Sequence, residues 1–159
     1  MTTPTQSNTV SLLRILKAPP ARVYRAFVEP EAKIRWEPPF GFLGKIHAWD
    51  CRVGGRYRIS FINFATGTTH TFGGEFLELV ENEKIVVTDA FEDPNLTGTV
   101  RMTVQLRAVL NGTELRIEQR GLPAVIPPEL CYAGWQESLV QLAQLVEAAV
   151  PDDPAACPG

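Results

Sequence analysis

The stretch Glu129–Val150, ELCYAGWQESLVQLAQLVEAAV, decides the fold of this chain. Its apolar residues recur at spacings of three and four while the opposite face is polar, which is the pattern of a long amphipathic helix. Pro127 or Pro128 suits the first turn of such a helix, and Pro151 stands just past its end. The apolar face of this expected C-terminal helix comprises Tyr132, Trp135, Leu139, Leu142, Val146 and Ala149.

The sequence before this helix alternates as β-strands do. In RYRISFINF, residues 56–64, the side chains of Tyr57, Ile59 and Phe61 fall on one face. The segments 99–109 and 113–120 alternate in the same way, and Asn111-Gly112 between them is a strong two-residue hairpin signal. We expect six or seven antiparallel strands in all, most of them between residues 44 and 120.

The N-terminal part is read as one strand followed by two short helices. Residues 8–17 form an apolar run that ends before Pro19 and Pro20, which is typical of a strand. Helical spacing then predicts short helices over Ala21–Val28 and Glu31–Trp36, separated by Pro30. The expected fold is α+β, with a single domain over residues 8–150 and flexible termini at residues 1–7 and 151–159.

One slender helix must cover one broad sheet. A helix is about 10 Å in diameter, so a sheet of six or seven strands is much wider and must curl around it to hide its apolar face. Leaving that face wet forfeits about 1.5 to 3 kcal/mol for each large side chain. We therefore expect a volume between sheet and helix, either filled by aromatic side chains or left as a pocket.

Composition excludes several classes of function. The 159 residues carry 15 Lys plus Arg against 18 Asp plus Glu, a net charge of −3, so neither nucleic acid nor an anionic membrane is an expected partner. The first residues have no signal-peptide pattern and no apolar run approaches the length of a membrane span, so we expect a cytoplasmic protein without membrane insertion. Three widely spaced cysteines indicate neither a disulfide framework nor a zinc site.

Two glycine pairs raise the question of a phosphate-binding loop. Gly54-Gly55 precedes a strand-like segment rather than a helix, and no GK[ST] follows, so a hairpin turn is favoured. Gly73-Gly74 lies inside an expected strand, where a bend or bulge is favoured over close approach of a backbone or ligand.

Reactive side chains form no recognisable catalytic or metal-binding motif. His47 and His70 lie in expected strands without HExxH spacing, and Cys131 is read as a small core residue on the helix rather than a nucleophile. More informative are Asp89 and Gln119, polar residues in line with apolar ones. A buried carboxylate needs a partner, so Asp89 either anchors a ligand or, as favoured here, reaches solvent at a strand end.

Several motifs in this order resemble one known family. These are WEPPFG, DCRVGGRYRI, GGEFLELVENEKIVVT, NGTELRIEQRG and GWQESLVQLAQLVE. Over about residues 10–149 the chain resembles the AHSA-type branch of the START-like superfamily (SRPBCC, or helix-grip), named for a domain of an ATPase activator of a heat-shock chaperone. The resemblance implies a helix-grip fold with a cavity between sheet and helix. It also implies lipids, polyketides or flavonoid-like aromatics as ligands in some members, and cyclase, oxygenase-subunit or co-chaperone roles in others.

Three functions remain open at this point. The leading one is binding or carriage of a small hydrophobic or aromatic ligand; the alternatives are a co-chaperone-like interaction, with a place in stress response, and a cyclase- or hydrolase-type enzyme using Asp89 or His70 as acid or base. No catalytic residue, metal or cofactor is assigned. A free sheet edge leaves both a monomer and a homodimer open. The expected ligand-binding residues are Trp36, Phe40, Tyr57, Ile59, Phe61, Phe72, Val87, Asp89, Met102, Val104, Ile117, Gln119, Trp135 and Leu139.

Overall fold

The structure, a computed structural model, describes residues 8–152. Strand 1 is followed by two short helices, a run of six strands and a long helix, which confirms the α+β arrangement expected from sequence. The elements are β1 (Thr9–Leu16), α1 (Pro20–Val28), α2 (Pro30–Trp36), β2 (Phe42–Trp49), β3 (Arg56–Asn63), β4 (Thr69–Val80), β5 (Lys84–Phe91), β6 (Val100–Val109), β7 (Gly112–Arg120) and α3 (Pro128–Val146).

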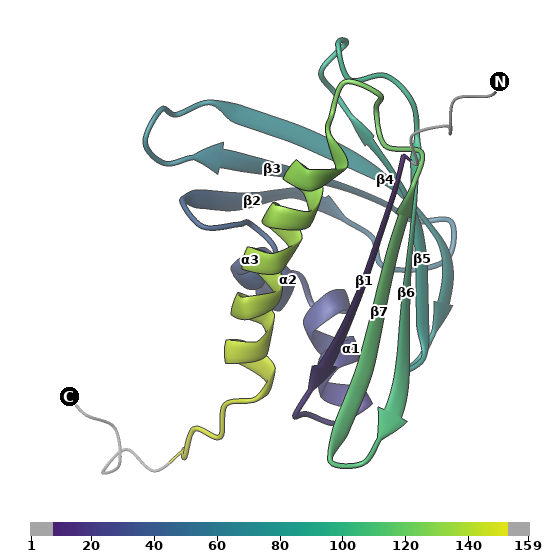
Figure 1. Cartoon of the computed structure of the whole chain (residues 1–159), viewed down its shortest axis with the longest axis vertical. Coiled ribbons are helices and arrows are strands. Elements are labelled where there is room, and N and C mark those ends of the chain that lie inside the picture. The colour runs from purple at the N-terminus through teal and green to yellow at the C-terminus, as the bar shows by residue number, and fades with distance from the viewer. Residues whose placement is uncertain (1–7, 153–159) are drawn as a thin grey trace, which may run out of the picture.

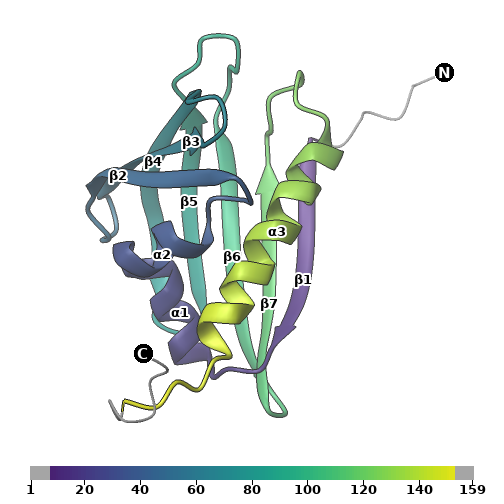
Figure 2. The same cartoon turned by 90° about the vertical axis from the view of Figure 1, so that its left-hand side faces the viewer.

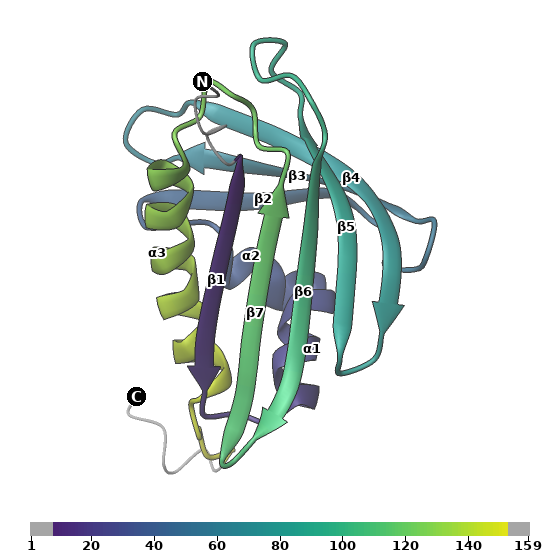
Figure 3. The same ribbon diagram turned by 45° about the vertical axis from the view of Figure 1, so that its right-hand side comes forward.

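All seven strands form one antiparallel sheet in the order β1-β7-β6-β5-β4-β3-β2. Consecutive strands from β2 to β7 are neighbours, as in a meander, and β1 adds to the end of the row by pairing with β7. The sheet is so strongly twisted that β2 and β3 run nearly crosswise to β1 and β7 (Figures 1 and 3). The curved sheet thus presents a concave face, which α3 crosses (Figure 2).

Both predicted hairpin turns are present, and the turn between β6 and β7 lies one residue earlier than expected. Gly54 has a φ of 85° in the turn between β2 and β3, and Gly55 donates its amide to the Arg52 carbonyl oxygen at 2.7 Å, so the glycine pair turns the chain as expected. Between β6 and β7 the two-residue loop is Leu110-Asn111 rather than Asn111-Gly112, because Gly112 already pairs with Val109. Asn111 supplies the left-handed conformation, with a φ of 63°.

Gly73 and Gly74 mark an irregular stretch of β4. The β4–β5 pairing breaks between Gly73 and Phe76, and its register shifts between Phe76 and Glu78. A Cβ atom on Gly74 would lie 1.9 Å from the Thr88 carbonyl oxygen, so the strands approach too closely there for any side chain. The glycine pair therefore marks a close approach of neighbouring backbone, the alternative that the sequence did not favour, and the register shift lies a few residues beyond the glycines.

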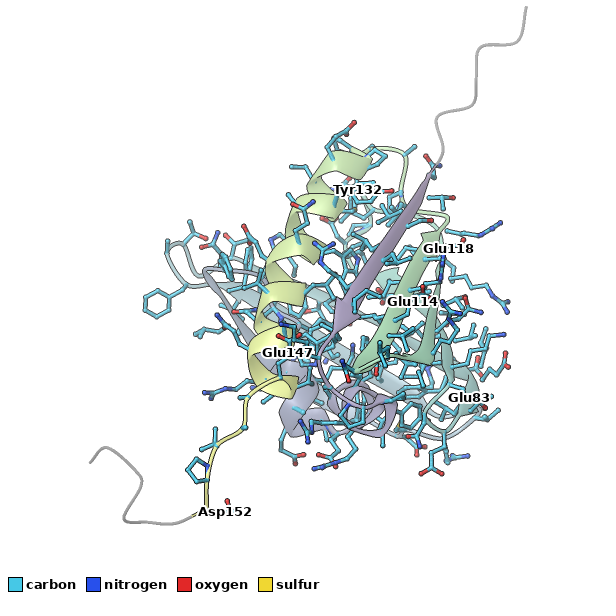
Figure 4. The ribbon with its side chains drawn as sticks, turned by 60° about the horizontal axis from the view of Figure 1, so that its bottom comes forward. Glu83, Glu114, Glu118, Tyr132, Glu147 and Asp152 are labelled. Atoms are coloured by element: carbon cyan, nitrogen blue, oxygen red, sulfur yellow. The ribbon has the colours of Figure 1, made fainter. Side chains whose placement is uncertain are left out.

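Helix α3 is shorter than the sequence pattern suggested. It ends at Val146, so Ala149 lies beyond it and is exposed instead of extending the apolar face. Tyr132 of α3 and Glu147 just after it bind the edge of β1 and the residue that follows that strand: the Tyr132 hydroxyl accepts the Ser11 amide at 3.1 Å, and Glu147 accepts the Lys17 amide at 2.8 Å. Figure 4 shows Tyr132 and Glu147 near opposite ends of α3, alongside β1.

The backbone of α3 stays away from most of the sheet. Its Cα atoms come within 8 Å of β1, α1 and α2, but among the described elements β2 to β7 have no comparable approach. Side chains must therefore span the gap above the central strands. Near the C-terminal end of α3 they do so completely, where Leu142 and Val146 are buried in the core with Leu115 of β7 and Val23 of α1.

The expectation of flexible termini concerns residues 1–7 and 153–159, which lie outside the described residues. Pro151 and Asp152 are described, belong to no helix or strand, and are exposed.

Candidate functional site

A cavity of about 260 Å³ lies between the N-terminal half of α3 and the concave face of the sheet. Strands β3, β4, β5 and β7 contribute one wall, and α3 contributes the other. The sheet wall consists of Phe61, Phe72, Phe91, Asp89 and Gln119, the helix wall of Cys131, Gly134, Trp135 and Ser138, and Glu37, Pro39, Phe42, His70 and Leu122 complete the lining.

The hollow exists because three of the four residues on the helix wall are small. Cys131, Gly134 and Ser138 occupy successive turns of α3 on the side that faces the cavity. A Cβ atom added to Gly134 would meet no atom within 4 Å. Large side chains at these positions would fill the space, as Leu142 and Val146 do further along the same helix.

Aromatic rings form most of the sheet wall. Phe61 and Phe72 pack edge to face with ring centroids 4.9 Å apart, and Phe72 and Phe91 have centroids 6.3 Å apart. Phe61 and Phe91 remain half-buried although the strand pattern turns them inward. Such a wall suits a flat apolar molecule.

A second, smaller cavity of about 40 Å³ continues from the first toward α1 and α2. Four residues line both cavities and so mark the boundary between them: Glu37, Phe72, Asp89 and Gln119. Three of these four side chains are polar. The inner end of an otherwise apolar cavity is therefore a polar boundary.

Asp89 is the most unusual group at this boundary. Its Oδ1 atom is buried and has no hydrogen-bond partner among the described residues. Burial, reinforced by the negative charge of Glu37, raises the pKa of Asp89 to about 7 even though the Tyr57 hydroxyl and the Lys33 ammonium act to lower it. The sequence-based preference for a solvent-exposed strand end is wrong, because β5 continues to Phe91 and the Asp89 side chain turns inward.

A buried ion pair on α2 lies beside Asp89. Lys33 Nζ contacts Glu37 Oε2 one helical turn away, and both side chains are largely shielded from solvent. The Lys33 ammonium also lies 5.5 Å from the Phe27 ring centroid and 5.2 Å from that of Trp36. Sequence reasoning missed this pair, since Lys and Glu at i, i+4 usually form a solvent-exposed pair; the adjacent Trp36 is the only local hint that this face is buried.

Hydrogen bonds hold the other polar groups of the boundary in place. The Tyr57 hydroxyl donates to the Thr88 carbonyl oxygen at 2.8 Å, and burial raises the pKa of this phenol, so it stays protonated. Trp135 Nε1 donates to Gln119 Oε1 at 2.9 Å, which links the helix wall to β7 across the gap. The Gln119 amide nitrogen makes no hydrogen bond to any described residue.

The expected ligand-binding residues divide into three groups. Phe61, Phe72, Asp89, Gln119 and Trp135 line the larger cavity, and Tyr57, Val87 and Met102 line only the smaller one. Ile59, Val104, Ile117 and Leu139 are buried core residues that line neither of these two cavities.

Trp36 and Phe40 also lie away from the cavities, for two different reasons. Trp36 is completely buried, and its Nε1 donates to the Ala26 carbonyl oxygen at 2.7 Å, so it belongs to the core between α1 and α2. Phe40 is 54% exposed, because the loop after α2 holds it outside while neighbouring Pro39 and Phe42 line the cavity.

The remaining reactive side chains are a cysteine and two histidines. Cys131 is half-buried, packs against the core and also lines the cavity, and burial raises the pKa of its thiol, which disfavours a thiolate nucleophile. His47 hydrogen-bonds Ser60 at 2.7 Å, whereas His70 lines the cavity. Within residues 8–152 no group of three or more His, Cys, Asp or Glu side chains is arranged to hold a metal ion.

The fold and cavity define the class of protein: a helix-grip domain with a hollow between its sheet and its C-terminal helix. The model of the family described as activator of Hsp90 ATPase homolog 1-like protein matches residues 17–147, and the chain belongs to this family. No curated protein matched the chain. In the described part of the chain, no helix is long and apolar enough to cross a membrane.

Solved structures of bacterial proteins share this fold. A crystal structure of a protein from Chromobacterium violaceum is 51% identical, with a TM-score of 0.89, and the match covers 89% of this chain and 99% of that one. A protein from Rhodobacter sphaeroides is 17% identical with a TM-score of 0.79, covering 91% and 95% of the two chains. One from Rhizobium leguminosarum is 24% identical with a TM-score of 0.72, covering 87% and 93%. The last two likenesses concern the fold alone.

Proposed function

We propose that this protein binds or carries a small hydrophobic or aromatic molecule in the cavity between α3 and the sheet. The observation that supports this most is the open, aromatic-walled space facing Gly134, where a side chain would meet nothing within 4 Å. A protein that needed only a stable core would gain from filling that space. The few polar groups at the inner end would orient the ligand.

An NMR titration with naphthalene, flavone and decanoate tests this proposal. At least one probe should shift the Trp135 indole signal and the amide signals of Phe61, Phe72 and Phe91 in a saturable way. Gly134→Leu places a side chain in the cavity and should abolish these shifts. Ala133→Leu is the matched control, because Ala133 is exposed on the neighbouring position of the same helical turn.

Two results would contradict the proposal. One is the absence of any saturable shift with all three probes. The other is equal binding by the Gly134→Leu variant and the wild-type protein, since a ligand in the cavity cannot share the space with the new side chain.

A second candidate is a co-chaperone-like interaction that regulates an ATPase, favoured by the description of the matching family. Such a role would work through the outer surface and would need no cavity ligand. Measuring the ATPase rate of an Hsp90-type chaperone with and without this protein tests it. Stimulation that persists in Gly134→Leu would favour the interaction role, and an unchanged rate would argue against it.

A further inference from the structure

The inner end of the cavity has hydrogen-bonding groups that the protein itself does not satisfy. Asp89 Oδ1 is buried without a partner, and leaving a buried acceptor unpaired is costly. The neighbouring donors make other contacts in this structure. The Tyr57 hydroxyl already donates to Thr88, and the Lys33 ammonium contacts Glu37.

A free donor lines the same boundary as this unpaired acceptor. Gln119 accepts from Trp135 through Oε1, which orients the amide and leaves its nitrogen as a free donor at the same boundary. Asp89 and Gln119 therefore offer one acceptor and one donor where the aromatic walls end. Both residues line the larger and the smaller cavity.

We propose that the ligand is an aromatic molecule bearing a hydroxyl group at its inner end, which donates to Asp89 Oδ1 and accepts from the Gln119 amide. A hydroxyl is a small neutral group that donates and accepts at a single atom. The aromatic body then lies between Phe61, Phe72 and Phe91 and the small residues of α3. This inference rests on the proposed function and names the ligand class for the same cavity.

An ammonium ligand fits these groups less well. The Lys33 ammonium already neutralises Glu37 beside Asp89 and would repel a second cation. The walls of the larger cavity are mainly phenyl rings, which do not replace the hydration of a charged group in the way that hydrogen-bond acceptors would.

The test compares 2-naphthol with 2-methylnaphthalene, which has nearly the same shape but lacks the hydroxyl. Affinities are measured by NMR titration of the full chain at pH 8. Wild type should bind 2-naphthol at least about tenfold more tightly, the ratio expected for one hydrogen bond to a charged group. Asp89→Leu should bind both compounds within about twofold, and Asp89→Asn, which keeps a neutral acceptor, should show an intermediate preference.

The outcomes separate this inference from the carrier proposal. Equal wild-type affinity for the two compounds, or a preference that survives in Asp89→Leu, would overturn the hydroxyl inference and leave the carrier proposal standing. Binding of neither compound to wild type would count against both. Tighter binding of 2-naphthylmethylamine than of 2-naphthol would overturn the hydroxyl inference and would indicate a cationic ligand.

Discussion

Two aromatic clusters on the same concave face of the sheet differ in their surroundings: one is packed in the core, and the other borders the larger cavity. The packed cluster consists of Trp49, Tyr57 and Phe76, with ring centroids 5.3 to 6.0 Å apart, and borders only the smaller cavity of about 40 Å³. The cavity cluster consists of Phe61, Phe72 and Phe91, with comparable centroid distances of 4.9 and 6.3 Å. Strands β3 and β4 contribute a ring to each cluster, so we attribute the difference to what faces each cluster.

Short helices cover the packed cluster, whereas a stretch of small residues faces the cavity cluster. Trp49 Nε1 donates to the Val28 carbonyl oxygen at the end of α1, at 3.0 Å, and this ties the packed cluster to that helix. The cavity cluster meets α3 where Gly134 leaves open space. Alternation along a strand therefore decides which side chains turn inward, and the opposing helix decides whether they form core or cavity.

A matched pair of substitutions sharpens this comparison most strongly. Phe76→Ala in the packed cluster should lower the free energy of unfolding by about 3 to 5 kcal/mol, because Phe76 is only 3% exposed and its loss leaves a void. Phe61→Ala in the cavity cluster should cost about 1 to 2 kcal/mol, because the half-buried ring already borders open space. Urea unfolding measures both, and equal losses would erase the distinction between the clusters.

Breaking the buried ion pair between Lys33 and Glu37 should give the next largest change in the free energy of unfolding. Lys33→Met should destabilise the fold by about 3 kcal/mol, because Glu37 is left buried without its counter-charge. Adding Glu37→Gln to Lys33→Met should restore much of the loss, again measured by urea unfolding. A double variant no more stable than Lys33→Met would mean that Lys33 acts by packing on Phe27 and Trp36 rather than by charge.

Replacing Asp89 should stabilise the protein in a pH-dependent way, whereas the substitutions above destabilise it. Its pKa is about 7 in the folded protein against 3.8 as the ordinary value, so the folded state retains a proton that the unfolded state has lost between these pH values. Stability contributed by this group is complete below about pH 4 and is lost as pH rises to about 7. Asp89→Asn removes the cost of ionisation, roughly 4 kcal/mol for a pKa raised from 3.8 to about 7. It should raise the free energy of unfolding by about 2 kcal/mol at pH 8, because asparagine keeps a buried polar group without a partner.

The same substitution should change stability little at about pH 3, where Asp89 is protonated in both states. Denaturation of wild type and Asp89→Asn at the two pH values gives the comparison directly. An equal effect at both pH values would show that Asp89 does not ionise in a buried setting.

Much of the fold could be predicted from the sequence, because its signals are local. Alternation located Tyr57, Ile59, Met102 and Val104 on the inner face, and helical spacing located α3. The pairing of β1 with β7 could not be derived in this way, because it joins residues about a hundred positions apart and no local pattern specifies it.

The candidate site was only partly predictable for the same physical reason. The inward orientation of Phe61, Phe72, Asp89 and Gln119 follows from strand alternation. The roles of Gly134 and Ser138 depend on which turn of α3 faces the cavity, which is a tertiary property. Lys33 and Glu37 were missed because a helix of seven residues gives no clear periodicity with which to recognise a buried charged face.

The central claim is that open apolar space faces Gly134, and the most direct test is the stability of Gly134→Leu relative to Gly134→Ala. Both variants remove the helix penalty of glycine, so their difference reports only what the larger side chain meets. The account predicts that Gly134→Leu is more stable than Gly134→Ala by about 1 kcal/mol, because the leucine enters vacant apolar space. A Gly134→Leu variant less stable than Gly134→Ala by about 1 to 3 kcal/mol, the usual cost of overpacking, would contradict it.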